Sequence, residues 1–150
     1  MKRCDLLHIG RRYMVQAIHL DPVLVEYPSP PVLNWMPDLI GWKLDIGFGG
    51  TYVLNSYIID VCANLKEFRK DSTNKAMAKS NLGQNRYYLT PDGLVQKADL
   101  PEGWGLIYYN TRTKRCRKVV PATYRSRFDV ERQEGLLLRS VAQNYTWEDC

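Results

Sequence analysis

The sequence lacks the long apolar runs of a membrane protein. No uninterrupted apolar stretch approaches the roughly 18 residues that a membrane-spanning helix needs. The N-terminal residues 1–5 lead into a stretch interrupted by polar residues, unlike the apolar segment of a signal peptide. Glycine (10 of 150 residues) and proline (8) occur in ordinary amounts, which excludes disordered and fibrous classes. We therefore expect a protein without a membrane partner.

Cysteine and histidine are too few and too scattered for most metal-binding classes. Cys4, Cys62, Cys116 and Cys150 form no C-x-x-C pair, so neither a zinc ribbon nor a disulfide framework is expected. The chain has only two histidines, which excludes a histidine-rich metal site. This pattern predicts reduced cysteines and a cytoplasmic location.

The signatures of small-molecule enzymes and of common DNA-binding modules are also missing. There is no glycine-rich phosphate loop and no recognisable pair of nucleophile and base. Helix-turn-helix, zinc-finger and RNA-recognition signatures are absent too. What the chain does have is a basic balance, with 21 Lys and Arg against 16 Asp and Glu and a net charge of +5. That balance is compatible with an anionic partner such as nucleic acid.

The hydrophobic pattern predicts one α/β domain that fills residues 1–150. Apolar spacings of three and four predict helices over 5–20, over 65–71 with Asn64 as its N-cap, and over 128–145. Runs rich in β-branched and aromatic residues predict strands over 23–27, 36–42, 52–62, 86–90, 104–109 and 115–120. This order of elements indicates a mixed β-sheet flanked by helices.

Two carboxylates stand out by their positions. Asp38 stands at the head of a predicted strand, and Asp60 lies inside the most apolar one. An acidic side chain in an apolar strand is unfavourable unless it is paired or binds a cation. If the two strands are neighbours, the carboxylates form a hard-oxygen site suited to Mg²⁺ or Mn²⁺. In the alternative, Asp38 caps a turn and Asp60 pairs with a Lys or Arg at the edge of the core.

The residues around these carboxylates resemble a known signature. Pro37-Asp38 followed by Asp60-Val61-Cys62 resembles the motif of the PD-(D/E)XK nuclease superfamily, the restriction-endonuclease-like fold. The resemblance is closest to a small bacterial and phage subgroup and spans roughly residues 5–120. The blocks that carry it are 37–42, 60–64, 67–68, 85–89, 91–94 and 100–106.

The resemblance implies a restriction-endonuclease-like core and hydrolysis of DNA phosphodiester bonds with Mg²⁺ or Mn²⁺. Asp38, Asp60 and the Val61 carbonyl would hold the metal, and Glu26 would be an outer carboxylate. His8 stands where relatives often carry a histidine, although a lone helical histidine is more often structural. The cell would be a bacterium or a phage-infected host.

One position departs from the family pattern. Cys62 stands where the motif has a lysine, and a neutral thiol cannot place a positive charge beside the attacking water. Lys66 and Lys43 are candidate replacements. Asp45 is a rival to Asp38, but no proline precedes it. Two functions stay open: an active metal-dependent nuclease, or an inactive relative that binds nucleic acid or a protein partner in phage defence or anti-defence.

A basic segment follows the predicted strand over 104–109. Its five basic side chains are predicted to contact the phosphates of nucleic acid. They are Arg112, Lys114, Arg115, Arg117 and Lys118. Alternatively, these charges protect an exposed edge strand from unwanted pairing. Tyr108, Tyr109 and Tyr124 flank the segment and would either stack on bases or pack in the core. Leu136, Leu137, Leu138 and Val141 of the last helix would form a homodimer interface or pack on their own core.

Overall fold

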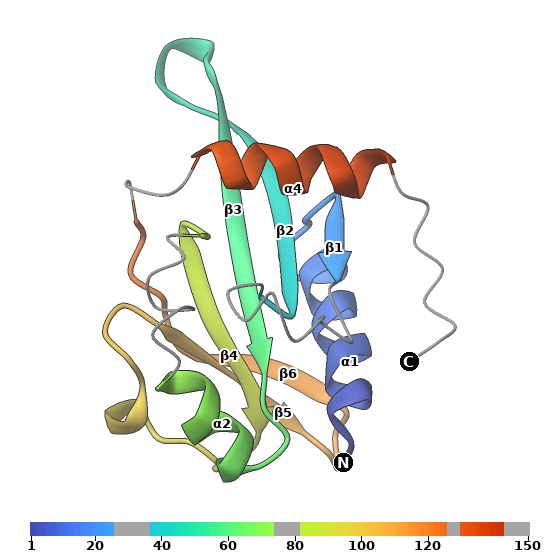
Figure 1. Cartoon of the computed structure of the whole chain (residues 1–150), viewed down its shortest axis with the longest axis vertical. Helices are drawn as coiled ribbons and strands as arrows, with labels where there is room; N and C mark the ends of the chain where they lie inside the picture. The colour runs from blue at the N-terminus through green and yellow to red at the C-terminus, as the bar shows by residue number, and fades with distance from the viewer. Residues whose placement is uncertain (26–36, 74–81, 126–129, 143–150) are drawn as a thin grey trace.

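A single mixed sheet organises the part of the chain that the computed structural model describes, residues 1–25, 37–73, 82–125 and 130–142 (Figure 1). Its strand order is β1-β2-β3-β4-β5-β6. The strands are β1 Val23–Val25, β2 Leu39–Ile46, β3 Tyr52–Val61, β4 Asn85–Pro91, β5 Gly105–Asn110 and β6 Arg115–Val120. The helices are α1 Arg3–Gln16, α2 Leu65–Ser72 and α4 Val130–Ala142, with short 3-10 turns at Phe48–Gly50 and Lys97–Asp99.

The pairing of the strands confirms the predicted α/β class. β1, β2 and β3 form an antiparallel meander, β4 runs parallel to β3, β5 runs parallel to β4, and β6 returns antiparallel. The parallel step from β3 to β4 passes through α2, as a crossover connection requires. None of the helices in the described ranges is long and apolar enough to cross a bilayer.

The two faces of the sheet carry separate cores because successive strand residues point to opposite sides. On one face Ile58, Tyr88 and Trp104 pack with Phe68 of α2 and Leu136 of α4. On the other face α1 packs its own apolar stripe, Leu6, Leu7 and Met14, against Ile59, Tyr87 and Leu89. Asp60 shares its side of β3 with Ile58 and Cys62, so it lies under α2 and not under α1.

Most predicted boundaries agree with the structure within two residues, but the first helix, predicted over 5–20, is Arg3–Gln16 and therefore ends four residues earlier. The predicted strand 36–42 extends to Ile46 because its second half pairs with β3, down to the Ile46–Tyr52 pair. Asn64 is the N-cap of α2, and its side chain accepts a hydrogen bond from the Glu67 amide at 2.9 Å. Of the predicted elements, residues 26–27, 36, 128–129 and 143–145 lie outside the described residues.

One cysteine differs from expectation. Cys4 is disulfide-bonded, whereas Cys62 and Cys116 are free thiols. The prediction that all four cysteines are reduced is therefore wrong at Cys4. The spacing of cysteines along the chain had no C-x-x-C signal from which this bond could be read, because a disulfide depends on tertiary proximity rather than on sequence distance.

The last helix is held to the sheet by a buried polar contact as well as by Leu136. The Gln133 Oε1 atom accepts hydrogen bonds from the Ser56 hydroxyl at 3.0 Å and the Gly83 amide at 2.6 Å. Leu136 is buried in the core, whereas Leu138 and Val141 are 69% and 68% exposed. The helix thus packs on its own core through Leu136 and leaves two apolar side chains outside. The predicted homodimer stays a prediction.

We expect Gln133→Ala to lower the free energy of unfolding by about 2 kcal/mol, since it leaves the Gly83 amide buried without its acceptor and removes one of two acceptors of the Ser56 hydroxyl. Urea denaturation followed by circular dichroism measures this difference. The control is Glu134→Ala, one residue along the same helix but exposed. Equal losses in both variants would mean that the buried contact does not account for the effect, because alanine itself favours the helix.

Candidate functional site

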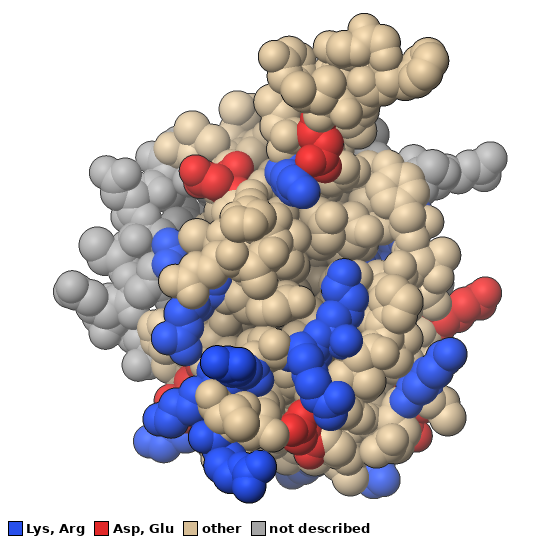
Figure 2. Space-filling model, turned by 180° about the vertical axis from the view of Figure 1, so that it is seen from behind, with Lys and Arg blue, Asp and Glu red and all other residues tan. Residues whose placement is uncertain are grey.

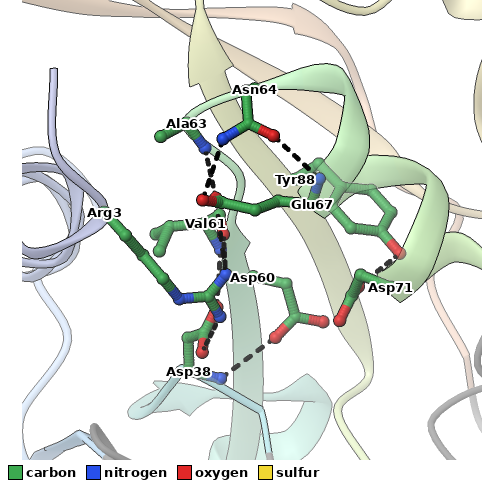
Figure 3. Close-up of polar contacts among 9 residues, drawn as sticks. All are labelled: Arg3, Asp38, Asp60, Val61, Ala63, Asn64, Glu67, Asp71 and Tyr88. Carbon is green, nitrogen blue, oxygen red and sulfur yellow. Dashed lines mark hydrogen bonds and ion pairs between the residues drawn. The ribbon is translucent and has the colours of Figure 1, made fainter.

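The two predicted carboxylates meet at one end of the β2–β3 pair. Asp38 immediately precedes β2, and Asp60 is the penultimate residue of β3, which runs antiparallel to β2. The Asp38 amide donates a hydrogen bond to Asp60 Oδ1 at 3.0 Å, and the Val61 amide donates to Asp38 Oδ2 at 2.8 Å (Figure 3). Both side chains are buried, with residue exposures of 6% for Asp38 and 2% for Asp60.

The cation that reaches this pair is Arg3, at the start of α1. Its Nη2 atom contacts Asp38 Oδ1 at 2.6 Å and Oδ2 at 2.7 Å, and its Nη1 donates to the Val61 carbonyl at 2.9 Å (Figure 3). The guanidinium also lies 3.7 Å from Glu67 of α2. A single side chain from α1 therefore joins the head of β2, the end of β3 and the first turn of α2.

Helix α2 contributes two further carboxylates to the cluster. Glu67 accepts hydrogen bonds from the Ala63 amide at 2.8 Å and from the Asn64 side chain at 3.0 Å. Asp71, one turn later on the same face, accepts a hydrogen bond from the Tyr88 hydroxyl at 2.8 Å. Figure 3 shows the carboxyl groups of Asp60 and Asp71 turned toward each other.

The surroundings of the two central carboxyl groups, Asp38 and Asp60, shift their pKa values to different extents. Burial raises the pKa of Asp60 well above its usual value, and the neighbouring charges of Asp71 and Asp38 raise it further. Burial raises the pKa of Asp38 as well, but the Arg3 charge and the Val61 amide oppose that rise. The pKa of Asp60 is therefore raised further than that of Asp38, whose ionised form Arg3 favours. The second oxygen of Asp60, Oδ2, has no hydrogen-bond partner.

Cys62 does not replace the motif lysine. Its side chain is fully buried, on the same side of β3 as Asp60. Burial raises the pKa of the thiol, and the charges of Asp71, Asp60 and Asp38 raise it further. Cys62 is therefore a neutral thiol that packs among apolar side chains, and it supplies neither a positive charge nor a thiolate ligand.

The donor set does not fit the Mg²⁺ or Mn²⁺ ion that the family resemblance implies. Both oxygens of Asp38 already contact Arg3, so a guanidinium lies where a divalent cation would need those oxygens. Asp60 Oδ1 already accepts the Asp38 amide, and the Cys62 sulfur is a soft donor, whereas hard cations require oxygen ligands. Within the described ranges, no group of three or more His, Cys, Asp or Glu side chains is arranged to hold a metal ion.

The remaining candidates lie away from the pair. Lys66 is exposed on α2, and Lys43 lies 3.4 Å from Asp45 in the other half of β2. The rival Asp45 is opposite Val53 and accepts a hydrogen bond from Asn55 at 2.6 Å, so it is far along the strand from Asp60. His8 is exposed on α1. Glu26 lies outside the described residues.

Sequence reasoning missed Arg3 and Asp71. Asp71 had a usable signal, because it follows Glu67 by four residues on a predicted helix and therefore shares its face. Arg3 had no signal, since nothing in the sequence indicates which strand the start of α1 would contact. The alternative expectation, in which a cation at the core edge pairs with a carboxylate, describes the contact correctly but assigns it to Asp60 instead of Asp38.

The basic segment occupies an edge of the sheet. Arg115 and Arg117 point to the α2 side of β6, where the Arg117 guanidinium lies 5.4 Å from the Tyr108 ring. Lys118 points to the α1 side, with its ammonium 5.7 Å from the Tyr87 ring. Arg112 and Lys114 are exposed in the turn before the strand. The charges thus lie on both faces, as the alternation of a strand predicts.

The tyrosines beside this segment have different environments. Tyr108 and Tyr109 are each 7% exposed, and the Tyr108 hydroxyl donates to the Val95 carbonyl, so both pack in the core. Tyr124 is 53% exposed and accepts a hydrogen bond from Gln84 at 2.9 Å. Only Tyr124 of these three is open to a base.

Comparison with known proteins bears on the fold alone. No model of a known protein family matches the chain, and no curated protein sequence is significantly similar to it. The structure is similar to that of the SPO1766 protein of unknown function from Silicibacter pomeroyi, with a TM-score of 0.64 and 15% sequence identity over 95% of this chain and 86% of that one. This similarity supports the α/β architecture.

We expect Arg3→Met to lower the free energy of unfolding by about 3 kcal/mol at neutral pH, because it leaves the buried Asp38 carboxylate without a cation. Urea denaturation measures the loss. In an Asp38→Asn background the same substitution should cost much less, since no buried charge remains to be paired. The same loss in both backgrounds would show that Arg3 acts through packing and not through its charge.

Asp60 predicts a pH dependence of stability. Its raised pKa means that the folded state keeps a proton that the unfolded state releases above about pH 4. Its contribution to stability is therefore full below that pH and is lost as the pH rises toward the folded-state pKa. Asp60→Asn cannot ionise and keeps an acceptor for the Asp38 amide.

The variant Asp60→Asn should therefore be more stable than the wild type near pH 8, and the advantage should shrink toward about pH 5. Urea denaturation across this range measures both effects. A destabilisation of the variant that is the same at every pH would contradict a protonated Asp60.

Proposed function

We propose that this chain is a catalytically inactive, restriction-endonuclease-like domain that binds nucleic acid. The single observation that carries the first half of the proposal is the contact of Arg3 with both oxygens of Asp38. In a metal-dependent nuclease those oxygens must be available to a divalent cation, which then neutralises the developing charge on the phosphate. Here a fixed guanidinium takes up the negative charge of Asp38 instead.

The resemblance to the PD-(D/E)XK superfamily is supported by the order of the elements around the cluster. A carboxylate heads one strand, a second carboxylate lies near the end of the antiparallel neighbour, and a helix follows at once. This is the arrangement that the motif blocks of the sequence imply. An inactive site also accounts for Cys62 at the position of the motif lysine. A site that does not act on a phosphate needs no positive charge there.

The second half of the proposal rests on the basic segment. Arg112, Lys114, Arg115, Arg117 and Lys118 are all exposed. Arg117 is also 3.6 Å from Asp92, but its side chain is 65% exposed, so this ion pair holds it weakly. Five exposed cations in seven positions favour contacts with a phosphate backbone, whose affinity is mainly electrostatic. The exposed apolar side chains of Ile46, Phe48 and Tyr52 at the β2–β3 turn favour the protein partner that the sequence left open, but they offer no charge to a phosphate backbone.

The proposal predicts binding without cleavage. Purified protein is incubated with plasmid and single-stranded DNA in Mg²⁺, Mn²⁺ or EDTA, and binding is measured by fluorescence anisotropy at several salt concentrations. We expect no cutting under any metal, and an affinity that falls steeply with salt. The paired substitution Arg115→Ala and Arg117→Ala should weaken binding and lower the salt dependence by roughly one to two ion contacts.

Two controls sharpen this experiment. Cys62→Lys should not restore cleavage, because Arg3 still contacts both oxygens of Asp38. Lys66→Ala removes one exposed charge on α2 and tests whether loss of any cation weakens binding. Metal-dependent cutting by the wild type that is lost in Asp38→Ala would overturn the inactive assignment and favour the nuclease.

A further inference from the structure

The face of the sheet that carries α1 has a groove beside the helix. Two neighbouring hollows, of about 210 Å³ and 140 Å³, share Tyr13 and Ala17 in their walls and therefore adjoin along α1. Figure 2 looks onto the side of the molecule opposite the view of Figure 1, and Lys and Arg side chains gather over its lower half. This groove lies on the other side of the sheet from Asp60 and α2, so it is separate from the carboxylate cluster.

The charged walls of the groove are of one sign. Lys43 and Lys118 line the larger hollow, and Arg12 and Lys114 line the smaller one, whereas no Asp or Glu lines either. Lys43 has Asp45 at 3.4 Å, but both side chains are more than one third exposed, so the pair is weak. Such a groove attracts an anion along its length and not at one point.

Aromatic side chains complete the walls. Tyr13 borders both hollows, and Tyr57 and Tyr87 border the larger one. Tyr13 and Tyr57 are half-buried, so part of each ring reaches the groove. Tyr87 is buried, and the Lys118 ammonium lies over its ring at 5.7 Å. Tyrosine faces next to lysines are the combination that proteins use to stack unpaired bases while they hold the phosphates.

The size and shape of the groove favour a linear anionic ligand over a compact one. Each hollow is smaller than the roughly 300 Å³ at which pockets for compact small molecules begin. Two small hollows in a row fit a linear chain that places one unit in each. In a duplex the bases are stacked inside the helix and cannot reach Tyr13 or Tyr57. An acidic peptide would use the cations but gain little from the tyrosines.

We propose that this groove binds single-stranded nucleic acid, with bases against Tyr13 and Tyr57 and phosphates at Lys43, Lys118, Arg12 and Lys114. The inference deepens the proposed function and rests on it, because it names the form of nucleic acid that is bound. Lys114 and Lys118 belong to both the groove and the basic segment, so a strand in the groove continues onto the edge of the sheet.

The test compares three probes of about 12 nucleotides: oligo-dT, oligo-rU and a mixed-sequence DNA duplex. Fluorescence anisotropy gives the affinity of full-length protein for each. We expect a single strand to bind more tightly than the duplex, and the two single-stranded probes show whether DNA or RNA is preferred. Tyr57→Leu should weaken single-strand binding about tenfold and leave duplex binding unchanged.

Lysine variants give a second measurement that does not depend on a half-buried residue. Lys118 is exposed, so Lys118→Ala should fold normally and should lower the slope of log affinity against log salt by about 0.7 for a single strand. The matched control is Lys70→Ala, an exposed lysine of α2 on the opposite face of the sheet, which should change nothing. Thermal unfolding of each variant checks that it is folded. If Tyr57→Leu is not folded, Arg12→Ala decides, because Arg12 is exposed and lines the groove but lies outside the basic segment.

The outcomes separate the two proposals. Nucleic acid that binds as a duplex as tightly as a single strand, with no effect of Tyr57→Leu or Arg12→Ala, overturns the groove and leaves the proposed function standing. Failure of all three probes to bind overturns both. Binding of a poly-aspartate peptide that competes equally and is equally weakened by Lys118→Ala overturns the assignment to nucleic acid.

Discussion

The contact between Arg3 and Asp38 is the interaction on which the rest of the polar architecture depends. It joins α1 to the head of β2, and through the Val61 carbonyl and Glu67 it also reaches β3 and α2. The Arg3 charge opposes the rise in the pKa of Asp38, whereas burial raises the pKa of the neighbouring Asp60 well above its usual value. The neutral state of Cys62 follows from its own burial and not from this ion pair.

The two faces of the sheet differ in what they offer to a ligand. On the α2 side, Asp38, Glu67 and Asp71 each have a hydrogen-bond or ion-pair partner, and Asp60 keeps one oxygen without a partner. On the α1 side the charged side chains that line the groove are of one sign, and aromatic rings lie between them. We therefore regard the carboxylate cluster as part of the framework and the basic, aromatic face as the part of the molecule available to a partner.

The sequence predicted most elements because their signals are local. The β-branched run of β3, the Asn64 cap of α2 and the alternating charges of β6 each depend on a few consecutive residues. It also placed Asp38 and Asp60 at strand positions from which an antiparallel pair brings them together. It failed at Cys4 and could not find Arg3, since both depend on which distant segment lies alongside the start of α1.

By itself, then, the sequence determined the α/β class, the strand that carries Asp60 and the basic edge formed by β6, because alternation and composition act within a single element. Only the tertiary structure decided what the carboxylates do. Whether Asp38 faces water, a metal or a guanidinium depends on the docking of α1, whose Arg3 stands 35 residues before Asp38 in the chain. The groove of Tyr13, Tyr57 and Lys118 was likewise invisible in the sequence, since its walls come from a helix and from strands that are neighbours only after folding.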